Sequence, residues 1–344
     1  MPRIPAPAAA SLALALAAAA GLQACRTPPP ADVIAADGVL CDLTQRLAAS
    51  DLRVSCLVQP GDDPHQFRLT PQQSRELSQA QLVLINGFGL TPALAELTKP
   101  GTSQTKTVAL AELAVPNSPV LEAAPPKSAD SHQHHDEDGQ PQEEDHAHGD
   151  RDPHVWHNPT QAAALVLLVA QQLQELKPAA QAPIAARAQA MTATLQQLDD
   201  WNRLQFATIP TARPLATGHR AFASLARAYK LEELPLVDAS SSSDTLRPQA
   251  FQAVVAQLKR DQVPMLFAEQ LPASKALQRI SALSGVPLAP APLVADGLAP
   301  SSDGAGSLVA TLTDNTCLIV NGLEGSCDRA SQQALVNRWQ AIGR

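Results

Sequence analysis

The order of predicted strands and helices limits the fold of this chain more than any other feature of its sequence. Short apolar runs such as "DVIAAD", "LRVSCLVQ" and "QLVLING" alternate with segments of helical spacing near the N-terminus. The alternation returns in the second half around "RPLATG", "LEELPLVD" and "PMLFAE". Strands that alternate with helices are typical of parallel sheets. We therefore predict an α/β protein with two lobes, each a mostly parallel sheet flanked by helices.

A long helical pattern lies between the two runs, in "AAQAPIAARAQAMTATLQQLDDWNRLQFATI". A helix of about 25 residues would be roughly 37 Å long, enough to run the length of a domain. We expect a rigid linking helix over residues 178–209, between an N-terminal lobe at 32–177 and a C-terminal lobe at 210–344. A chain of 344 residues is long enough for two such lobes. The stiff connection predicts small rearrangements on ligand binding.

The N-terminus has the layout of an export signal. In "MPRIPAPAAASLALALAAAAGLQAC", the basic Arg3 precedes an apolar stretch, and the Leu-x-Ala-Cys ending resembles a bacterial lipobox. We predict a signal peptide at 1–24, lipidation of Cys25, a tether at 25–31 and a location outside the cytoplasm on a bacterial membrane. Ordinary signal cleavage and an uncleaved anchor are the alternatives. No other stretch stays apolar for the about 18 residues that a membrane span needs.

The remaining cysteines are even in number once Cys25 is acylated. In an oxidising compartment they favour disulfides, for which three pairings exist. We expect the two local pairings, because these close short loops within one lobe: Cys41 with Cys56, and Cys317 with Cys327. Free buried thiols are the alternative. A cysteine zinc site is not expected, because no C-x-x-C pair is present.

Residues 118–152 form a segment of Pro, Ser, Gln, His and acidic residues with almost no large apolar side chains. Such a composition cannot bury enough surface to offset the entropy of ordering, so we predict a disordered insertion. One interpretation is a mobile, low-affinity collector or sensor of zinc, and the other is a solvated acidic linker with incidental metal affinity. The histidines concerned are His132, His134, His135, His146 and His148.

Of four further residues, three lie near the ends of predicted strands, where open α/β sheets bind their ligands, and His154 follows the predicted insertion. Three imidazoles and one carboxylate make a four-coordinate set that suits Zn²⁺, and the net charge of −8 favours a cation over a nucleic acid. Taken singly, each residue has an ordinary interpretation as a solvated, capping or turn residue. The residues are His65, His154, His219 and Asp296.

Four motifs in this order resemble the metal-specific solute-binding proteins of bacterial ABC importers, the zinc and manganese group. They are "LVQPGDDPHQF", "DPHVWHNP", "TGHRAFASLARAYKL" and "MLFAEQLPASKALQRIS". The resemblance implies that the four residues named above hold one metal ion in a cleft between the lobes. It also implies that Glu269 orients a ligand, and we expect His157 to be a packing or orienting group.

The residue at position 219 bears on the metal. Manganese members of this group have a glutamate there, whereas a third imidazole shifts the preference toward zinc, and this chain has His219. The acidic, histidine-rich insertion also resembles that of the zinc subgroup.

The resemblance implies that a monomer captures Zn²⁺ outside the plasma membrane and delivers it to a membrane permease driven by an ATPase. It implies a lipid-anchored binding protein with no catalytic activity and no nucleic-acid partner. Manganese import is one alternative, and a metal-dependent adhesin or zinc store is another. A zinc hydrolase is disfavoured, because no H-E-x-x-H or comparable acid/base motif is present.

Overall fold

The computed structural model describes residues 30–98, 105–121, 151–211, 213–236, 248–300 and 306–343. Residues from Ala31 onward form one compact unit, which is the unit described below. The predicted signal peptide, Cys25 and the five histidines of the predicted insertion lie outside the described residues. Among the described helices, none combines the length and the apolar character needed to cross a membrane.

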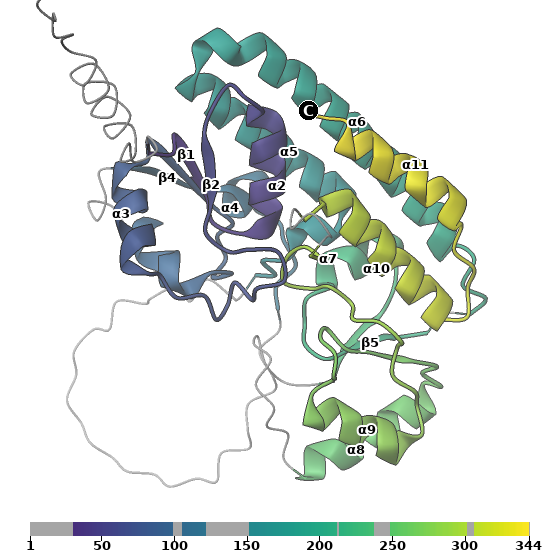
Figure 1. Ribbon diagram of the computed structural model, residues 1–344. Helices are drawn as coiled ribbons and strands as arrows, with labels where there is room; N and C mark the ends of the chain where they lie inside the picture. The colour runs from purple at the N-terminus through teal and green to yellow at the C-terminus, as the bar shows by residue number, and fades with distance from the viewer. Residues whose placement is uncertain are drawn as a thin grey trace, which may run out of the picture. The chain divides into compact units, whose positions relative to one another are not determined.

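The first lobe is built on a parallel sheet with the strand order β2-β1-β3-β4. Strands β1 and β3 are buried along their whole length, which explains why both are continuous apolar runs. The strands are β1 (Val33–Ala35), β2 (Val54–Cys56), β3 (Leu82–Ile85) and β4 (Lys106–Ala109). The connecting helices are α2 (Gly38–Ala48), α3 (Pro71–Gln79), η2 (Pro92–Thr98) and α4 (Leu110–Ala114), most of which are labelled in Figure 1.

The second lobe repeats this plan on a smaller sheet, with the parallel order β6-β5-β7. Its strands are β5 (Leu215–Thr217), β6 (Glu233–Pro235) and β7 (Leu266–Phe267). Its helices are α7 (Ala223–Tyr229), α8 (Pro248–Arg260) and α9 (Lys275–Ser284). Both sheets are parallel and flanked by helices, so the predicted fold class is confirmed.

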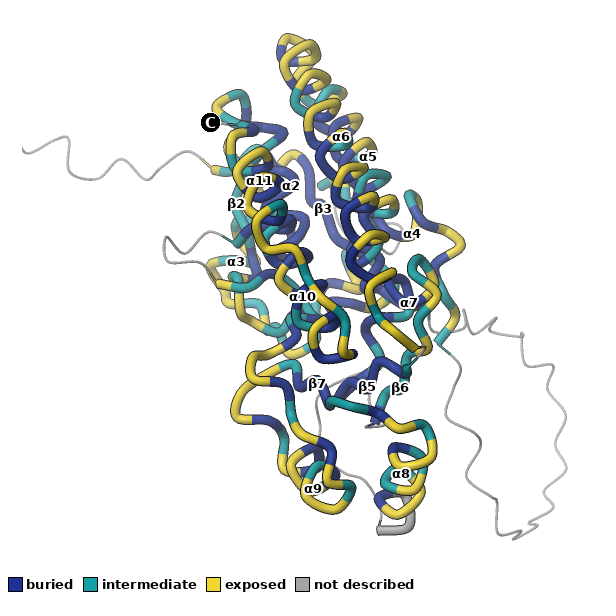
Figure 2. The backbone as a smooth tube through the Cα atoms, turned by 90° about the vertical axis from the view of Figure 1, so that its right-hand side faces the viewer, coloured by how far each residue is buried: buried dark blue, intermediate teal, exposed yellow. Residues whose placement is uncertain are grey.

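Longer helices accompany the two sheets. Helix α6 has 26 residues and is therefore about 39 Å long. It runs beside α5, and both helices have buried and exposed residues along their length (Figure 2). The longer helices are α5 (Pro159–Leu176), α6 (Gln181–Phe206), α10 (Leu308–Gly322) and α11 (Arg329–Gln340). Two short helical turns, η3 (Val155–His157) and η4 (Pro178–Ala180), precede α5 and α6 respectively.

Two of these helices contribute side chains to the apolar cores of both lobes. In α6, Leu195 belongs to the first-lobe core and Phe206 to the core that surrounds β5. In α10, Leu312 belongs to the first-lobe core and Ile319 to the second. Helix α11 adds Trp339 to the first-lobe core. The last helices of the chain thus pack against its first helix and strands, and the lobe boundaries remain a prediction.

Both local disulfides are present in the structure. Cys41 pairs with Cys56 at a Cα–Cα distance of 5.7 Å, and Cys317 pairs with Cys327 at 5.1 Å. The first bond ties α2 to β2, and the second ties α10 to the loop before α11. Each bond therefore joins neighbouring elements.

Candidate metal centre

His65 lies in the loop between β2 and α3, within the "GDDPH" turn. Its backbone N–H donates to Asp63 Oδ1 at 2.8 Å, which fixes the turn from inside. The loop follows the carboxyl end of a parallel strand, where such folds place their ligands. This position brings the His65 ring from the first lobe toward the second.

His154 stands directly before η3 and is held by the fully buried carboxylate of Asp152. Asp152 Oδ1 accepts the backbone N–H of His154 at 2.9 Å and lies 2.8 Å from the ring atom Nδ1. Asp152 Oδ2 accepts the N–H of Ser224 in α7 at 3.1 Å. A carboxylate on Nδ1 fixes the tautomer and leaves Nε2 free to face a metal. One carboxylate therefore orients the imidazole and links it to the second lobe.

His219 follows β5 by two residues, and a second, partly buried carboxylate holds its backbone. Glu269 Oε1 accepts the N–H of Gly218 at 2.7 Å and that of His219 at 3.2 Å. The same oxygen lies 3.7 Å from His219 Nδ1, beyond hydrogen-bond distance. Glu269 thus supports the loop that carries His219 and does not contact Asp296 in the described hydrogen bonds.

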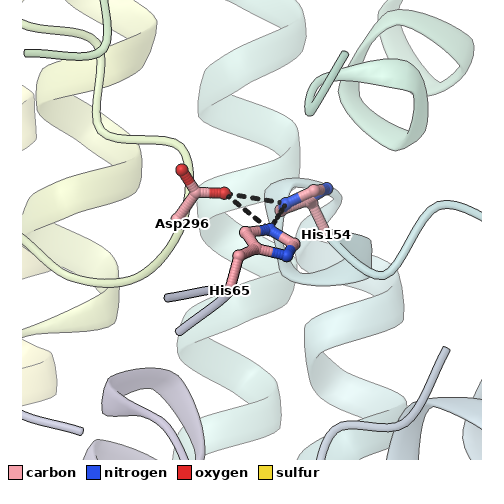
Figure 3. Close-up of side chains that lie close together, drawn as sticks. All are labelled: His65, His154 and Asp296. Atoms are coloured by element: carbon pink, nitrogen blue, oxygen red, sulfur yellow. Dashed lines mark hydrogen bonds and ion pairs between the residues drawn. The ribbon is translucent and has the colours of Figure 1, made fainter. Parts of the chain in front are cut away.

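Asp296 brings the three imidazoles together. Its Oδ1 atom lies 3.2 Å from His65 Nε2, 3.0 Å from His154 Nε2 and 3.3 Å from His219 Nε2. The Nε2 atoms of His65 and His154 are 3.4 Å apart. Figure 3 shows the rings of His65 and His154 pointing toward Asp296 from different segments. The residues that we predict as ligands therefore form one cluster.

His219 stands slightly apart within this cluster. The ligand atoms of His65, His154 and Asp296 all lie within 4.8 Å of one another, the one group of this kind among the described residues. His219 joins them through its contact with Asp296 and through a ring that lies 5.9 Å from the His154 ring. Since His219 Nε2 lies 3.3 Å from Asp296 Oδ1, His219 contacts the cluster through this carboxylate.

The charges within the cluster compensate one another. Burial opposes ionisation of Asp296, but hydrogen bonds from the three imidazoles outweigh it and hold the pKa of Asp296 well below its usual value. Burial would lower the pKa of His154, but hydrogen bonds to Asp152 and Asp296 raise it to about 10. The pKa of His219 is also raised, since Asp296 and Glu269 outweigh its burial. A divalent cation would replace the protons held on these imidazoles.

His157 is buried but does not face the other imidazoles. Its Nε2 atom lies 2.9 Å from the carbonyl oxygen of Ala295, and its ring packs 4.6 Å from that of Phe222. Burial lowers the pKa of His157 to about 4, so the ring is neutral. The structure therefore gives His157 contacts with protein groups only.

A cavity of about 320 Å³ borders the cluster and is lined from both lobes. The first lobe contributes Asp62 and Asp63, and the second contributes His219, Glu269 and Asp296. Carboxylates of one sign raise the local concentration of cations. The cavity is therefore a cation-attracting cleft with the cluster at its wall.

The molecule has two lobes built on parallel sheets, and a cluster of imidazoles and a carboxylate lies beside the cleft that they share. This arrangement is typical of metal-binding proteins that receive a solute between two lobes. The chain belongs to the family described as zinc-uptake complex component A, periplasmic, whose model matches residues 33–322. The resemblance seen in the sequence is confirmed at the level of metal-binding ABC transporter proteins. The protein acts outside the cytoplasm and is not an enzyme, as predicted.

Individual relatives differ in the metal that their names give. The chain is 23% identical to the metal ABC transporter substrate-binding lipoprotein SloC of Streptococcus mutans, over 88% of this chain and 94% of that protein. It is 23% identical to the manganese-binding lipoprotein MntA of Halalkalibacterium halodurans, over 85% and 88%. Its fold matches the periplasmic zinc-binding protein TroA of Treponema pallidum with a TM-score of 0.72 at 24% identity, over 86% and 99% of the two chains.

Asp152 was not predicted as a site residue, because it is the last residue of the segment 118–152 that we predicted to be a disordered insertion, whereas the structure gives it as fully buried. The signal was present in "DPHVW", because an aspartate two residues before a histidine can accept both its backbone N–H and its ring N–H. The second contact of Asp152, to the N–H of Ser224, joins residues 72 positions apart. No local pattern predicts a contact of that range.

Proposed function

We propose that the chain captures Zn²⁺ outside the plasma membrane and delivers it to the permease of an ABC importer. One observation carries the proposal: three imidazole Nε2 atoms converge on a single carboxylate oxygen beside an acidic cleft. Each imidazole comes from a different segment, so this convergence is a property of the fold. In this proposal the metal ion is the transported solute.

The spacing of His65, His154 and Asp296 fits three of the four positions around a tetrahedrally coordinated ion. Zinc binds imidazole nitrogen and carboxylate oxygen at about 2.0 to 2.2 Å, so neighbouring ligand atoms around it are about 3.3 Å apart. The contacts of Asp296 with the three histidines are 3.0 to 3.3 Å long, and the contact between His65 and His154 is 3.4 Å. His219 Nε2 lies 3.3 Å from Asp296 Oδ1 but is not in the group of ligand atoms within 4.8 Å of one another, so the His219 side chain would have to move toward His65 and His154 to complete the site.

The donor set favours zinc over manganese. Three nitrogens and one carboxylate suit zinc, whereas manganese prefers a set richer in oxygen. His219 supplies the third nitrogen, and Oε1 of Glu269, a carboxylate that also lines the cleft, accepts two backbone N–H groups. These two bonds favour a role for Glu269 in supporting the His219 loop over a role as a further oxygen ligand.

The remaining parts of the proposed function concern Cys25 and the five histidines of the insertion, which lie outside the described residues. Cys25 would carry the lipid that anchors the protein to the membrane, and the monomer would meet the permease and its ATPase there. The histidine-rich insertion at 118–152 would collect zinc weakly near the cleft.

Calorimetric titration of the metal-stripped mature protein with Zn²⁺ and then Mn²⁺ tests the proposal. We expect one tight zinc site, weaker manganese binding and additional weak zinc sites. A variant that lacks residues 126–150 should keep the tight site and lose the weak ones. If all zinc binding disappears with these residues, the cleft is not the site and the chain is a histidine-rich metal buffer.

The variant His219→Glu tests the choice of metal. Replacing the third nitrogen by oxygen should weaken zinc binding and strengthen manganese binding, so that the ratio of the two affinities changes by about tenfold or more. Glu175→Gln, far along α5 in an exposed pair with Lys106, is the control and should change neither affinity. Tighter binding of manganese by the unaltered protein would assign the chain to manganese import.

A further inference from the structure

His157 contacts the segments that carry two of the cluster residues. It lies in η3, three residues after His154, and its Nε2 atom is 2.9 Å from the carbonyl oxygen of Ala295, the residue before Asp296. Its ring lies against Phe222, three residues after His219. His157 therefore touches both second-lobe segments from the first-lobe side of the cleft.

The contact with Ala295 fixes the tautomer of His157. A carbonyl oxygen only accepts hydrogen bonds, so Nε2 carries the proton and donates it. Nδ1 is then an acceptor, and it is buried with no hydrogen-bond partner among the described residues. A buried acceptor without a partner costs about 1 to 3 kcal/mol, a cost that an apolar side chain would avoid.

The bond to Ala295 is a contact that an apolar side chain cannot make. The Ala295 carbonyl and the Asp296 carboxylate belong to consecutive residues, so holding the first restricts the position of the second. Asp296 has no protein group on Oδ1 other than the three imidazoles in the described hydrogen bonds. A contact with the neighbouring backbone, such as the one at the Ala295 carbonyl, can therefore fix the position of the Asp296 carboxylate from outside the cluster.

We propose that His157 is a positioning residue that sets the metal affinity by holding Asp296 in place through the Ala295 carbonyl. This inference rests on the proposed function, because it assigns His157 a role toward the same ion. His157 does not bind the metal. Residues that hold a ligand in this way change metal affinity by about 10- to 100-fold when they are removed.

Two substitutions separate the hydrogen bond from the packing. His157→Gln keeps an N–H donor at about the position of Nε2, whereas His157→Phe keeps an aromatic ring against Phe222 and loses the donor. We expect His157→Phe to bind zinc about tenfold or more weakly and His157→Gln to stay within about threefold of the unaltered protein. Equal losses in both variants, or no loss in His157→Phe, would overturn the inference.

A double-mutant cycle tests whether His157 acts through Asp296. In the Asp296→Ala background the additional effect of His157→Phe should fall to less than about twofold, because there is no carboxylate left to position. In the His65→Ala background the full effect should remain. A residue that merely stabilises the fold would give the same effect in both backgrounds. Thermal unfolding of each metal-free variant verifies that it is folded. If His157→Phe does not fold, His157→Asn replaces it, because the asparagine amide is too short to reach Ala295.

The single variants separate a failure of the inference from a failure of the proposed function. If Asp296→Ala and His154→Ala bind zinc as tightly as the unaltered protein, the cleft is not the zinc site and the proposed function fails. If both weaken binding while His157→Phe and His157→Gln match the unaltered protein, the proposed function stands and the positioning role is wrong.

Discussion

Gly218 and Gly297 each lie next to a residue of the metal cluster, but a side chain would meet different surroundings at each position. A Cβ atom on Gly218 would overlap the carboxylate of Glu269, which closely approaches the backbone there. A Cβ atom on Gly297 would meet nothing within 4 Å. The two glycines therefore form a matched pair.

Gly218→Ala should displace Glu269 and shift the loop of His219. Overpacking of this kind costs about 1 to 3 kcal/mol, and loss of the supporting carboxylate should weaken zinc binding about tenfold or more. Gly297→Ala should leave the zinc affinity within about twofold. Calorimetric titration of the two variants checks this, and equal affinities would show that the Glu269 contacts do not support the site.

The charge state of His154 predicts how zinc binding and stability depend on pH. Its pKa is raised from 6.5 to about 10 in the folded, metal-free protein. The stabilisation that this shift gives the metal-free fold is fully present below pH 6.5 and is lost as pH rises toward 10. Zinc must displace the same proton, so its apparent affinity should rise over this range, by about tenfold per pH unit for each proton displaced.

Titration in two buffers with different ionisation enthalpies counts these protons. At pH 7.5 we expect zinc to release at least one, and denaturant unfolding of the metal-free protein should give a lower stability at pH 9 than at pH 7. A binding enthalpy that does not depend on the buffer would contradict the charged state of His154.

At the scale of elements, Asp42 of α2 ties the first lobe to the end of the chain. Its Oδ2 atom accepts the N–H of Leu308 at 2.9 Å and the indole N–H of Trp339 at 2.8 Å, while Arg46 donates to Oδ1 at 2.6 Å. Burial raises the pKa of Asp42 in spite of these partners. One buried carboxylate therefore joins α2, α10 and α11.

Asp42→Ala should lower the free energy of unfolding by about 3 to 5 kcal/mol, because it leaves the Nε–H group of the partly buried Arg46 and two further N–H groups without their acceptor. Glu175→Ala in α5 is the control, since the Glu175 side chain is 50% exposed and pairs with Lys106 at 2.9 Å; we expect a change of at most about 1 kcal/mol. Urea unfolding measures both. A small effect at Asp42 would mean that α10 and α11 are held by apolar packing alone.

The helical periods of α10 and α11 are visible in the sequence, but the partner of their buried faces is not. A spacing of apolar residues predicts which side of a helix is covered, not which element covers it. The alternation of strands and helices predicted the parallel sheets because it follows from local patterns. The contact between Trp339 and Asp42 joins residues 297 positions apart, and only the folded chain makes it.

For the whole molecule, the shared helices limit how far the lobes can move. Helices α6 and α10 contribute to both cores, so wide closure about a flexible hinge would disrupt packed side chains. We expect the radius of gyration of the mature protein to differ by less than about 1 Å between the metal-free and zinc-loaded forms. Small-angle X-ray scattering of both forms measures this difference, and a large contraction on zinc binding would rule out the rigid arrangement.

The candidate site shows a similar limit of prediction across the whole chain. Three of the predicted ligands, His65, His154 and His219, lie in motifs of the sequence, whereas Asp296 follows a predicted strand region; the structure places all four together. The contact between His157 and Ala295 could not be predicted, since it depends on the position of a loop 138 residues away. Sequence motifs thus identify the residues of the metal cluster more readily than they identify the residues that hold the cluster in position.

The contribution of α10 and α11 to the first-lobe core also has a consequence for biosynthesis. Leu312 and Trp339 belong to the same apolar core as Leu40, so this core cannot be completed until nearly the last residue has been synthesised. A chain that acts outside the cytoplasm has to cross a membrane first. The late completion of its larger core delays stable folding and leaves the nascent chain in a form that can still be threaded across.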